Sequence, residues 1–172
     1  LNEKIRDYCK EVGYPVIRAD TDSVFVDLKE DDPKKCVELA KQLEKEINDR
    51  YGEWFKGMNN DTSYFLIKFD KLYGLMYSGD EKKLYGGKII WDWEKDFLIE
   101  PAIEIKGFAA KRIDRSTFSR QLQTNVFKMI FNEESNKAIK EYIFDEIDNI
   151  LAMKYNYETI GIPKAITKDV SE

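Results

Sequence analysis

The sequence predicts an α+β fold, in which a half that mixes helices with strands is followed by a mainly helical half. Two patterns predict it: apolar residues recur with helical and strand periods up to about residue 115, and with the helical period alone after it. A content of 42% hydrophobic and 13% aromatic residues is too high for a disordered chain. The 172 residues suffice for one ordinary domain or two small ones with a buried core.

A helix is expected at the start of the chain, because apolar residues recur there at helical spacing. They are Leu1, Ile5, Cys9 and Val12. Gly13 suits the residue that follows a helix end. Residues 14–19 and 24–28 are rich in strand-forming residues and flank a polar turn, which predicts a hairpin.

A second helix is expected from Pro33, because proline is favoured at the first helical position and an apolar stripe follows it. The stripe consists of Cys36, Val37, Ala40, Leu43 and Ile47. Three strands are then expected, with a turn at residues 78–81 between the second and the third. Their bounds are residues 64–69, 72–77 and 84–91.

Two further helices are predicted after residue 115. The first has an apolar stripe of Phe118, Leu122, Val126 and Ile130. The second would begin near Asn132, where Glu133 and Glu134 place negative charge over the positive end of a helix. Its apolar residues are Ala138, Ile139, Tyr142, Ile143, Ile147, Ile150 and Leu151.

The composition excludes several kinds of chemistry. The chain has no histidine, so mechanisms that need an imidazole are excluded, and a metal ion would need oxygen ligands, which favours Mg²⁺, Mn²⁺ or Ca²⁺ over Zn²⁺. Cys9 and Cys36 give no disulfide framework, so reduced thiols and a cytoplasmic location are expected. No apolar run approaches the roughly 18 residues of a membrane span, so no membrane partner is expected.

Charge is unevenly distributed along the chain, whose formal net charge is −5. Residues 1–67 carry 11 basic and 15 acidic side chains, whereas residues 106–120 carry five basic ones and one acidic one. A compact basic stretch in an acidic chain is either a site for an anionic partner or a solvated charged face. The five basic residues are Lys106, Lys111, Arg112, Arg115 and Arg120.

The strongest local signal for chemistry is Asp20-Thr21-Asp22-Ser23, in the expected hairpin turn. Two carboxylates at positions i and i+2 can face the same side of an extended strand. At a hairpin tip they would lie close together, and a divalent cation would relieve their repulsion, as a two-metal site requires. The alternative is a plain Asp-rich turn, because Asp and Ser are ordinary turn residues.

Residues 20–23 resemble the third palm motif of family B DNA polymerases, and later segments resemble further motifs of that family in the same order. These segments are residues 69–73 (Phe-Asp-Lys-Leu-Tyr), 82–87 (Lys-Lys-Leu-Tyr-Gly-Gly), 104–108 (Glu-Ile-Lys-Gly-Phe), 111–114 (Lys-Arg-Ile-Asp) and 166–169 (Ile-Thr-Lys-Asp). The resemblance, which is to archaeal-like members, extends over residues 15–169. It implies a partial palm domain with an antiparallel sheet at residues 1–108 and a helical thumb domain at residues 109–172.

The resemblance also implies roles for three carboxylates. Asp22 matches the ligand of both catalytic Mg²⁺ ions, and Asp20 matches the aspartate that supports the site. Asp70 matches a nearby acidic position on the adjacent strand, where glutamate is common, and its alternative interpretation is an outward-facing strand acid. Arg18 stands where relatives usually have tyrosine, and a guanidinium there would compete with the cations for negative charge.

Five residues are expected to contact DNA. Lys83 and Tyr85 lie two apart on an expected strand and would share one face, and the resemblance implies that they touch the new duplex near the primer end. Lys106, Lys111 and Arg112 would contact backbone phosphates, which gives a sequence-independent grip. The alternatives are a solvated lysine beside a core tyrosine, and a solvated charged face.

The first palm motif and the finger motif of the family have no counterpart in the sequence. The chain is therefore expected to be the C-terminal palm and thumb portion of a DNA-directed DNA polymerase, excised or encoded as a small subunit, and inactive alone. Its expected partners are primer–template DNA, a deoxynucleoside triphosphate and the remaining N-terminal part of the polymerase. Two alternatives stay open: a non-catalytic DNA-binding subunit with a decayed metal site, and an unrelated metal enzyme with a complete site in this chain.

Overall fold

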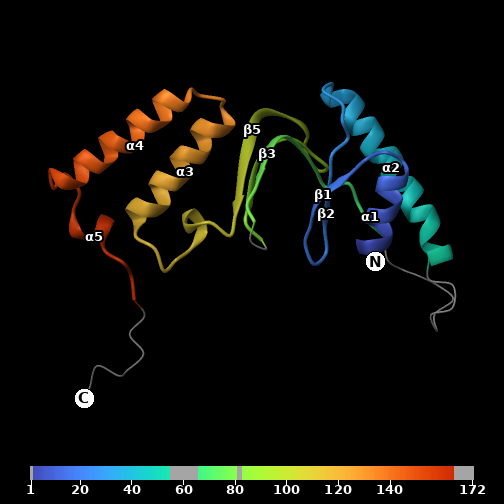
Figure 1. Ribbon diagram of the computed structural model, residues 1–172, viewed down its shortest axis with the longest axis horizontal. Helices are drawn as coiled ribbons and strands as arrows, with labels where there is room; N and C mark the ends of the chain where they lie inside the picture. Colours follow the sequence, from blue (N-terminus) through green and yellow to red (C-terminus); the bar gives the residue numbers. More distant parts are fainter. Residues whose placement is uncertain (1, 55–65, 81–82, 165–172) are drawn as a thin grey trace, which may run out of the picture. The chain divides into compact units, whose positions relative to one another are not determined.

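The computed structural model describes residues 2–54, 66–80 and 83–164 (Figure 1). Within them, helices and small antiparallel sheets confirm the α+β prediction. Parts of several sequence expectations fall outside the described residues: Leu1 of the first helix, residues 64–65 of an expected strand, residue 81 of the expected turn, residue 82 of the segment 82–87, and the segment 166–169.

The chain divides into two compact units, each of which takes residues from separate parts of the sequence. Unit 1 comprises Leu1–Gly74 and Ile89–Pro101, and unit 2 comprises Leu75–Lys88 and Ala102–Glu172. Because this division follows packing, it assigns parts of the strands β3 (Lys71–Ser78), β4 (Tyr85–Asp92) and β5 (Asp96–Lys106) to both units. The expected boundary between residues 108 and 109 stays a prediction.

Unit 1 is built on two helices, α1 (Asn2–Glu11) and α2 (Pro33–Trp54), whose apolar faces share a core. The prediction that α2 begins at Pro33 is confirmed, and its apolar stripe is buried. Gly13 follows α1 with a φ of 94°, a left-handed conformation that glycine adopts without strain. The buried residues of the core are Ile5, Tyr8, Cys9, Leu43, Ile47 and Tyr51. Both cysteines of the chain are buried and free.

The predicted strand at residues 64–69 is wrong over its described part, residues 66–69. Side chains of α2 hold the backbone of this segment instead of a neighbouring strand. Asn48 accepts from the Ile67 N–H at 2.9 Å and donates to the Ile67 carbonyl at 3.0 Å, and Glu44 accepts from the Phe69 N–H at 2.9 Å. This segment, which is held on α2 and forms no strand, is called the strap.

Unit 2 contains α3 (Thr117–Phe131) and α4 (Asn136–Leu151), which lie side by side in Figure 1. Its core is formed by Ile105 together with Phe127 and Phe131 of α3. The predicted apolar stripe of α3 is therefore only partly right: Phe118 is buried, but Ile130 is exposed. A short 3-10 helix, η1 (Ala109–Lys111), and the one-turn helix α5 (Tyr157–Ile160) also belong to this unit.

The predicted start of α4 at Asn132 is wrong. Ser135 caps the helix, since its hydroxyl accepts from the Ala138 N–H at 3.2 Å. Asn132 instead ends α3, where its N–H donates to the Lys128 carbonyl at 2.9 Å. The chain turns between the two helices at Glu133, which has a φ of 57°.

The second sheet has the strand order β3-β4-β5. The predicted strands at residues 72–77 and 84–91 are confirmed as β3 and β4. The long strand β5 was not predicted from the sequence. Pro101 lies inside it, and proline is tolerated there because β5 is an edge strand, where one backbone N–H can be missing.

Candidate metal-binding hairpin and nucleic-acid interface

The predicted hairpin is confirmed in unit 1 as strands β1 (Val16–Ala19) and β2 (Val24–Val26), which pair antiparallel. In its register Ala19 lies opposite Val24, so the residues between them form the turn. The Asp20 N–H donates to the Ser23 carbonyl at 2.8 Å and closes that turn. The two candidate metal-binding carboxylates therefore occupy one tight turn.

Helix α1 anchors the tip of the hairpin. The side-chain amide of Asn2 donates to the Asp20 carbonyl at 2.8 Å, and residues of β1 and β2 pack on the core beneath α1 and α2. Behind the turn, the Phe25 ring packs on Tyr73 of β3 with ring centroids 5.9 Å apart. These contacts fix the position of the turn relative to the rest of unit 1.

The two carboxylates of the turn have different surroundings. Asp20 is half-buried, and its Oδ1 accepts from the N–H of the next residue, Thr21, at 2.9 Å. Asp22 is exposed to solvent. One carboxylate oxygen of Asp20 is thus engaged in a hydrogen bond within the turn, whereas the Asp22 side chain is open to solvent.

Asp70, the third candidate ligand, immediately precedes β3 and its side chain is 61% exposed. Its Oδ2 lies 3.9 Å from Nζ of Lys71, and its carbonyl accepts from the Trp93 N–H at 3.1 Å. Among the described residues, no group of three or more Cys, Asp or Glu side chains is gathered closely enough to hold a metal ion. The donors are hard oxygens that suit Mg²⁺, but the described carboxylates do not make a complete site.

The expected geometry of Lys83 and Tyr85 is wrong. Strand β4 begins at Tyr85, and Lys83 precedes it with a φ of 62°, so the two residues do not share a strand face. The Lys83 carbonyl packs tightly against Gly107, where a Cβ would clash. Lys83 is exposed, whereas Tyr85 is only 2% exposed and lies in the core.

Tyr85 lies beneath Lys106 in unit 2. The Lys106 Nζ lies 5.3 Å from the centroid of the Tyr85 ring and 3.6 Å from Oε1 of Glu104. A hydrogen bond with the Tyr85 hydroxyl, assisted by the charge of Glu104, raises the pKa of Lys106 above its ordinary value. The ammonium group is therefore held in place and stays charged at neutral pH.

Lys111 and Arg112 follow each other at η1, and both are exposed. Arg112 makes a bidentate ion pair with Asp114, with its Nε 2.9 Å from Oδ1 and its Nη2 2.7 Å from Oδ2. This guanidinium also holds the pKa of Asp114 below its usual value. Lys111 is thus the more available cation of the two.

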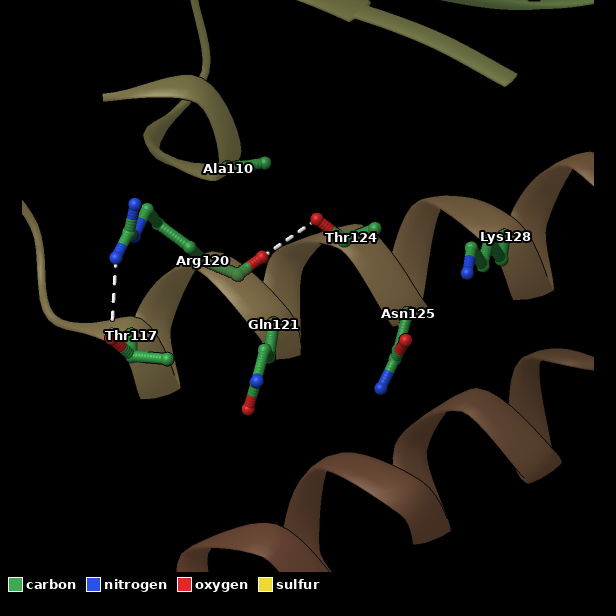
Figure 2. Close-up of a pocket in the computed structure, with 7 residues that line it drawn as sticks. All are labelled: Ala110, Thr117, Arg120, Gln121, Thr124, Asn125 and Lys128. Atoms are coloured by element: carbon green, nitrogen blue, oxygen red, sulfur yellow. Dashed lines mark hydrogen bonds between the residues drawn. The ribbon is translucent and has the colours of Figure 1, made fainter. Parts of the chain in front are cut away.

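A groove on unit 2 was not predicted from the sequence (Figure 2). It has a volume of about 390 Å³, and we call it the α3 groove. In the sequence the groove corresponds to a polar stripe at helical spacing. This stripe lies on a different side of α3 from the predicted apolar stripe. The lining residues are Ala110, Thr117, Arg120, Gln121, Thr124, Asn125 and Lys128.

Comparison with known proteins identifies the family. Residues 2–169 match the model of "DNA polymerase family B", and the chain belongs to this family. It is 26% identical over 161 residues to DNA polymerase 2 of Aeropyrum pernix, and 25% identical over 171 residues to the DNA polymerase delta catalytic subunit of Candida albicans. These matches cover 94% and 97% of this chain, but only 17% and 15% of the two relatives.

The family match excludes one of the alternatives. The alternative of an unrelated metal enzyme requires that the motifs resemble the family by chance. The match over residues 2–169 excludes this alternative. Separately, no helix in the described part of the chain has the length and apolar character of a membrane span.

Proposed function

We propose that the chain is the C-terminal palm and thumb segment of a DNA-directed DNA polymerase. The observation that carries this proposal is the position of Asp20 and Asp22 in one anchored hairpin turn, within a chain that matches family B over residues 2–169. The chain spans about one sixth of the length of its relatives, which supports a segment that acts with further palm and finger parts.

In this proposal the exposed carboxylate of Asp22 holds Mg²⁺, and the Asp20 carboxylate supports it from within the turn. Bound Mg²⁺ would lower the pKa of the primer 3′-hydroxyl and stabilise the pyrophosphate leaving group during attack on the α-phosphate of a deoxynucleotide. The remaining ligands come from the other part of the polymerase. Asp70 is the weakest member of the set, because Nζ of Lys71 lies 3.9 Å from its Oδ2.

The DNA contacts in this proposal belong to unit 2. Lys83, Lys106 and Lys111 carry exposed or half-exposed ammonium groups that can neutralise backbone phosphates. Tyr85 is buried, so it acts by positioning Lys106. Arg112 contributes less, because Asp114 already occupies its guanidinium.

The test of the metal role is Asp22→Asn in the polymerase that this segment completes. Loss of a ligand to the catalytic ions should reduce deoxynucleotide incorporation about a thousandfold, which corresponds to about 4 kcal/mol of transition-state stabilisation. Asp27→Asn is the matched control, since Asp27 is an exposed aspartate just after β2. Incorporation that survives Asp22→Asn would refute the metal role.

A second measurement tests the claim that the chain is only a part. The isolated chain, with primer–template DNA, deoxynucleoside triphosphates and Mg²⁺, should give no extension, because its described carboxylates form no complete metal site. Extension by the isolated chain would show that all catalytic groups lie within it.

A non-catalytic DNA-binding subunit is the second candidate function. It is favoured by Arg18, which lies on β1 two residues before Asp20 and brings positive charge to the hairpin. This candidate predicts unchanged DNA binding and unchanged activity of the assembly in Asp22→Asn. It also predicts that no Asp-x-x-Ser-Leu-Tyr-Pro-Ser motif is encoded upstream.

A further inference from the structure

The turn that carries Asp20 and Asp22 is held by a side chain that lies outside the hairpin and outside the motifs described above. Asn2, at the start of α1, donates from its side-chain amide to the Asp20 carbonyl at 2.8 Å and, more weakly, to the Thr21 carbonyl at 3.5 Å. The Thr21 carbonyl belongs to the peptide group that leads into Asp22. The Asn2 amide therefore holds the stretch of main chain that carries the exposed Asp22 carboxylate.

The lengths of α1 and β1 explain why the start of the helix meets the tip of the hairpin. From Asn2 to Glu11 the helix rises about 13.5 Å, at about 1.5 Å for each residue. From Val16 to Asp20 an extended chain covers about 13 Å, at about 3.3 Å for each residue. Because the chain turns at Gly13 and β1 then contacts α1, these nearly equal lengths bring Asn2 to the level of Asp20.

Helix α1 is a fixed base for this anchor. Its residues Ile5, Tyr8 and Cys9 are buried in the core that α1 and α2 share. The Tyr8 hydroxyl also donates to Oε2 of Glu46 on α2 at 2.6 Å. Because a side chain on a packed helix holds its partner more precisely than one on a loop, Asn2 can restrict the position of the turn.

The hydrogen bonds within the turn do not supply this restriction. The Asp20 N–H donates to the Ser23 carbonyl at 2.8 Å, and Oδ1 of Asp20 accepts from the Thr21 N–H at 2.9 Å. Both bonds set the local shape of the turn but not its position relative to α1. The bonds from Asn2 set that position, and because they end on main-chain carbonyls they occupy no carboxylate oxygen that a cation would need.

We propose that Asn2 is a positioning residue of the metal-binding turn, which holds the Asp22 carboxylate in one place for Mg²⁺. This inference rests on the proposed function, in which Asp22 is a ligand of the catalytic ions. Asn2 acts through the main chain of the turn and would not itself touch the ion. Without its amide the turn would still form, but its tip would move, and a carboxylate out of position binds a cation less well.

The first test uses the 172-residue chain and needs no activity. Asn2→Leu keeps the approximate size of the side chain, adds no charge and removes the amide donors. Hydrogen exchange of the Asp20 N–H, measured by NMR, should become about five- to tenfold faster, because the loss of one hydrogen bond loosens the turn. Asn136→Leu is the matched control, since Asn136 likewise begins a helix, α4, in the other unit. Thermal unfolding of both variants verifies the fold.

The second test uses the polymerase that this segment completes. Asn2→Leu should raise the Mg²⁺ concentration at half-maximal incorporation about five- to tenfold, whereas the KM for the deoxynucleotide at saturating Mg²⁺ should stay the same. A loss of stability alone would lower the amount of active enzyme without changing its dependence on Mg²⁺. Asn2→Gln, which retains an amide, should restore part of both effects.

The outcomes separate this role from the proposed function. Both effects of Asn2→Leu are required: if either matches the Asn136→Leu control, the positioning role is overturned, and an inactive Asp22→Asn variant leaves the proposed function standing. Incorporation that survives Asp22→Asn overturns the proposed function and the positioning role with it. If Asn2→Leu does not fold, Asn2→Ala carries the same two measurements.

Discussion

At the residue scale, Asp20 and Asp22 share a turn but have different surroundings. One oxygen of the half-buried Asp20 accepts the Thr21 N–H, and Asp22 is exposed. The sequence could predict the turn, because Asp and Ser between two β-rich runs are typical of one. It could not predict the burial of Tyr85, because a strand motif does not show which of its side chains meets the core.

Tyr8 and Glu46 provide a residue-scale prediction about pH. The Tyr8 hydroxyl donates to Oε2 of Glu46 at 2.6 Å, and this hydrogen bond is the main reason why the pKa of Glu46 is lowered. A carboxylate with a lowered pKa in the folded state stabilises the fold above its ordinary pKa near 4.5, and that stability is lost as the pH falls through the folded value. Tyr8→Phe should therefore cost about 1 kcal/mol at neutral pH and less in acid.

Urea unfolding of the chain and of Tyr8→Phe between pH 3 and pH 7 checks this prediction. The difference in unfolding free energy between the two proteins should shrink below about pH 4.5, when Glu46 becomes protonated in both. A difference that stays constant over the whole range would show that Glu46 does not act through Tyr8.

At the element scale, the helices follow their sequence patterns more closely than the strands do. The helical period and Pro33 predicted the start and the apolar stripe of α2 correctly, because that stripe is the face that the core buries. The backbone of residues 66–69 bonds to Asn48 and Glu44, which lie far earlier in the chain, so a local pattern could not distinguish this strap from a strand. Strand β5 was not predicted, because Pro101 and the exposed polar residues of β5 interrupt the strand period in the sequence.

Two glycines give a matched prediction at this scale. A Cβ on Gly86 of β4 would lie 3.3 Å from the Phe131 ring and 3.1 Å from the Glu104 carbonyl, so Gly86→Ala should destabilise the chain by about 1–3 kcal/mol. A Cβ on Gly52 of α2 meets nothing within 4 Å, so Gly52→Ala should stabilise the chain by about 0.5–1 kcal/mol.

Thermal or urea unfolding of the two variants measures both effects with the same chemical change. Opposite signs are expected, because Gly86 makes room for α3 while Gly52 only weakens a helix. A Gly86→Ala variant as stable as the parent would mean that α3 does not pack on β4 as described.

At the scale of the whole molecule, the candidate functional groups are divided between the two units. Unit 1 carries the candidate metal-binding carboxylates, and unit 2 carries the candidate phosphate-binding cations. The sequence indicated this separation through its acidic first part and the basic stretch at residues 106–120. It could not reveal the α3 groove, because that stripe of mostly neutral polar residues resembles a solvated helix face until Arg120 is placed against η1.

The most direct test of the account is the salt dependence of primer–template binding by the unmodified chain. Three to five cations of unit 2 on separate phosphates should give a slope of log K against log salt of about −3 to −4.5, at about −0.9 for each neutralised phosphate. A chain that binds no duplex in 50 mM salt, or binds it with a slope near zero, would contradict the claim that this segment holds the duplex of a family B polymerase.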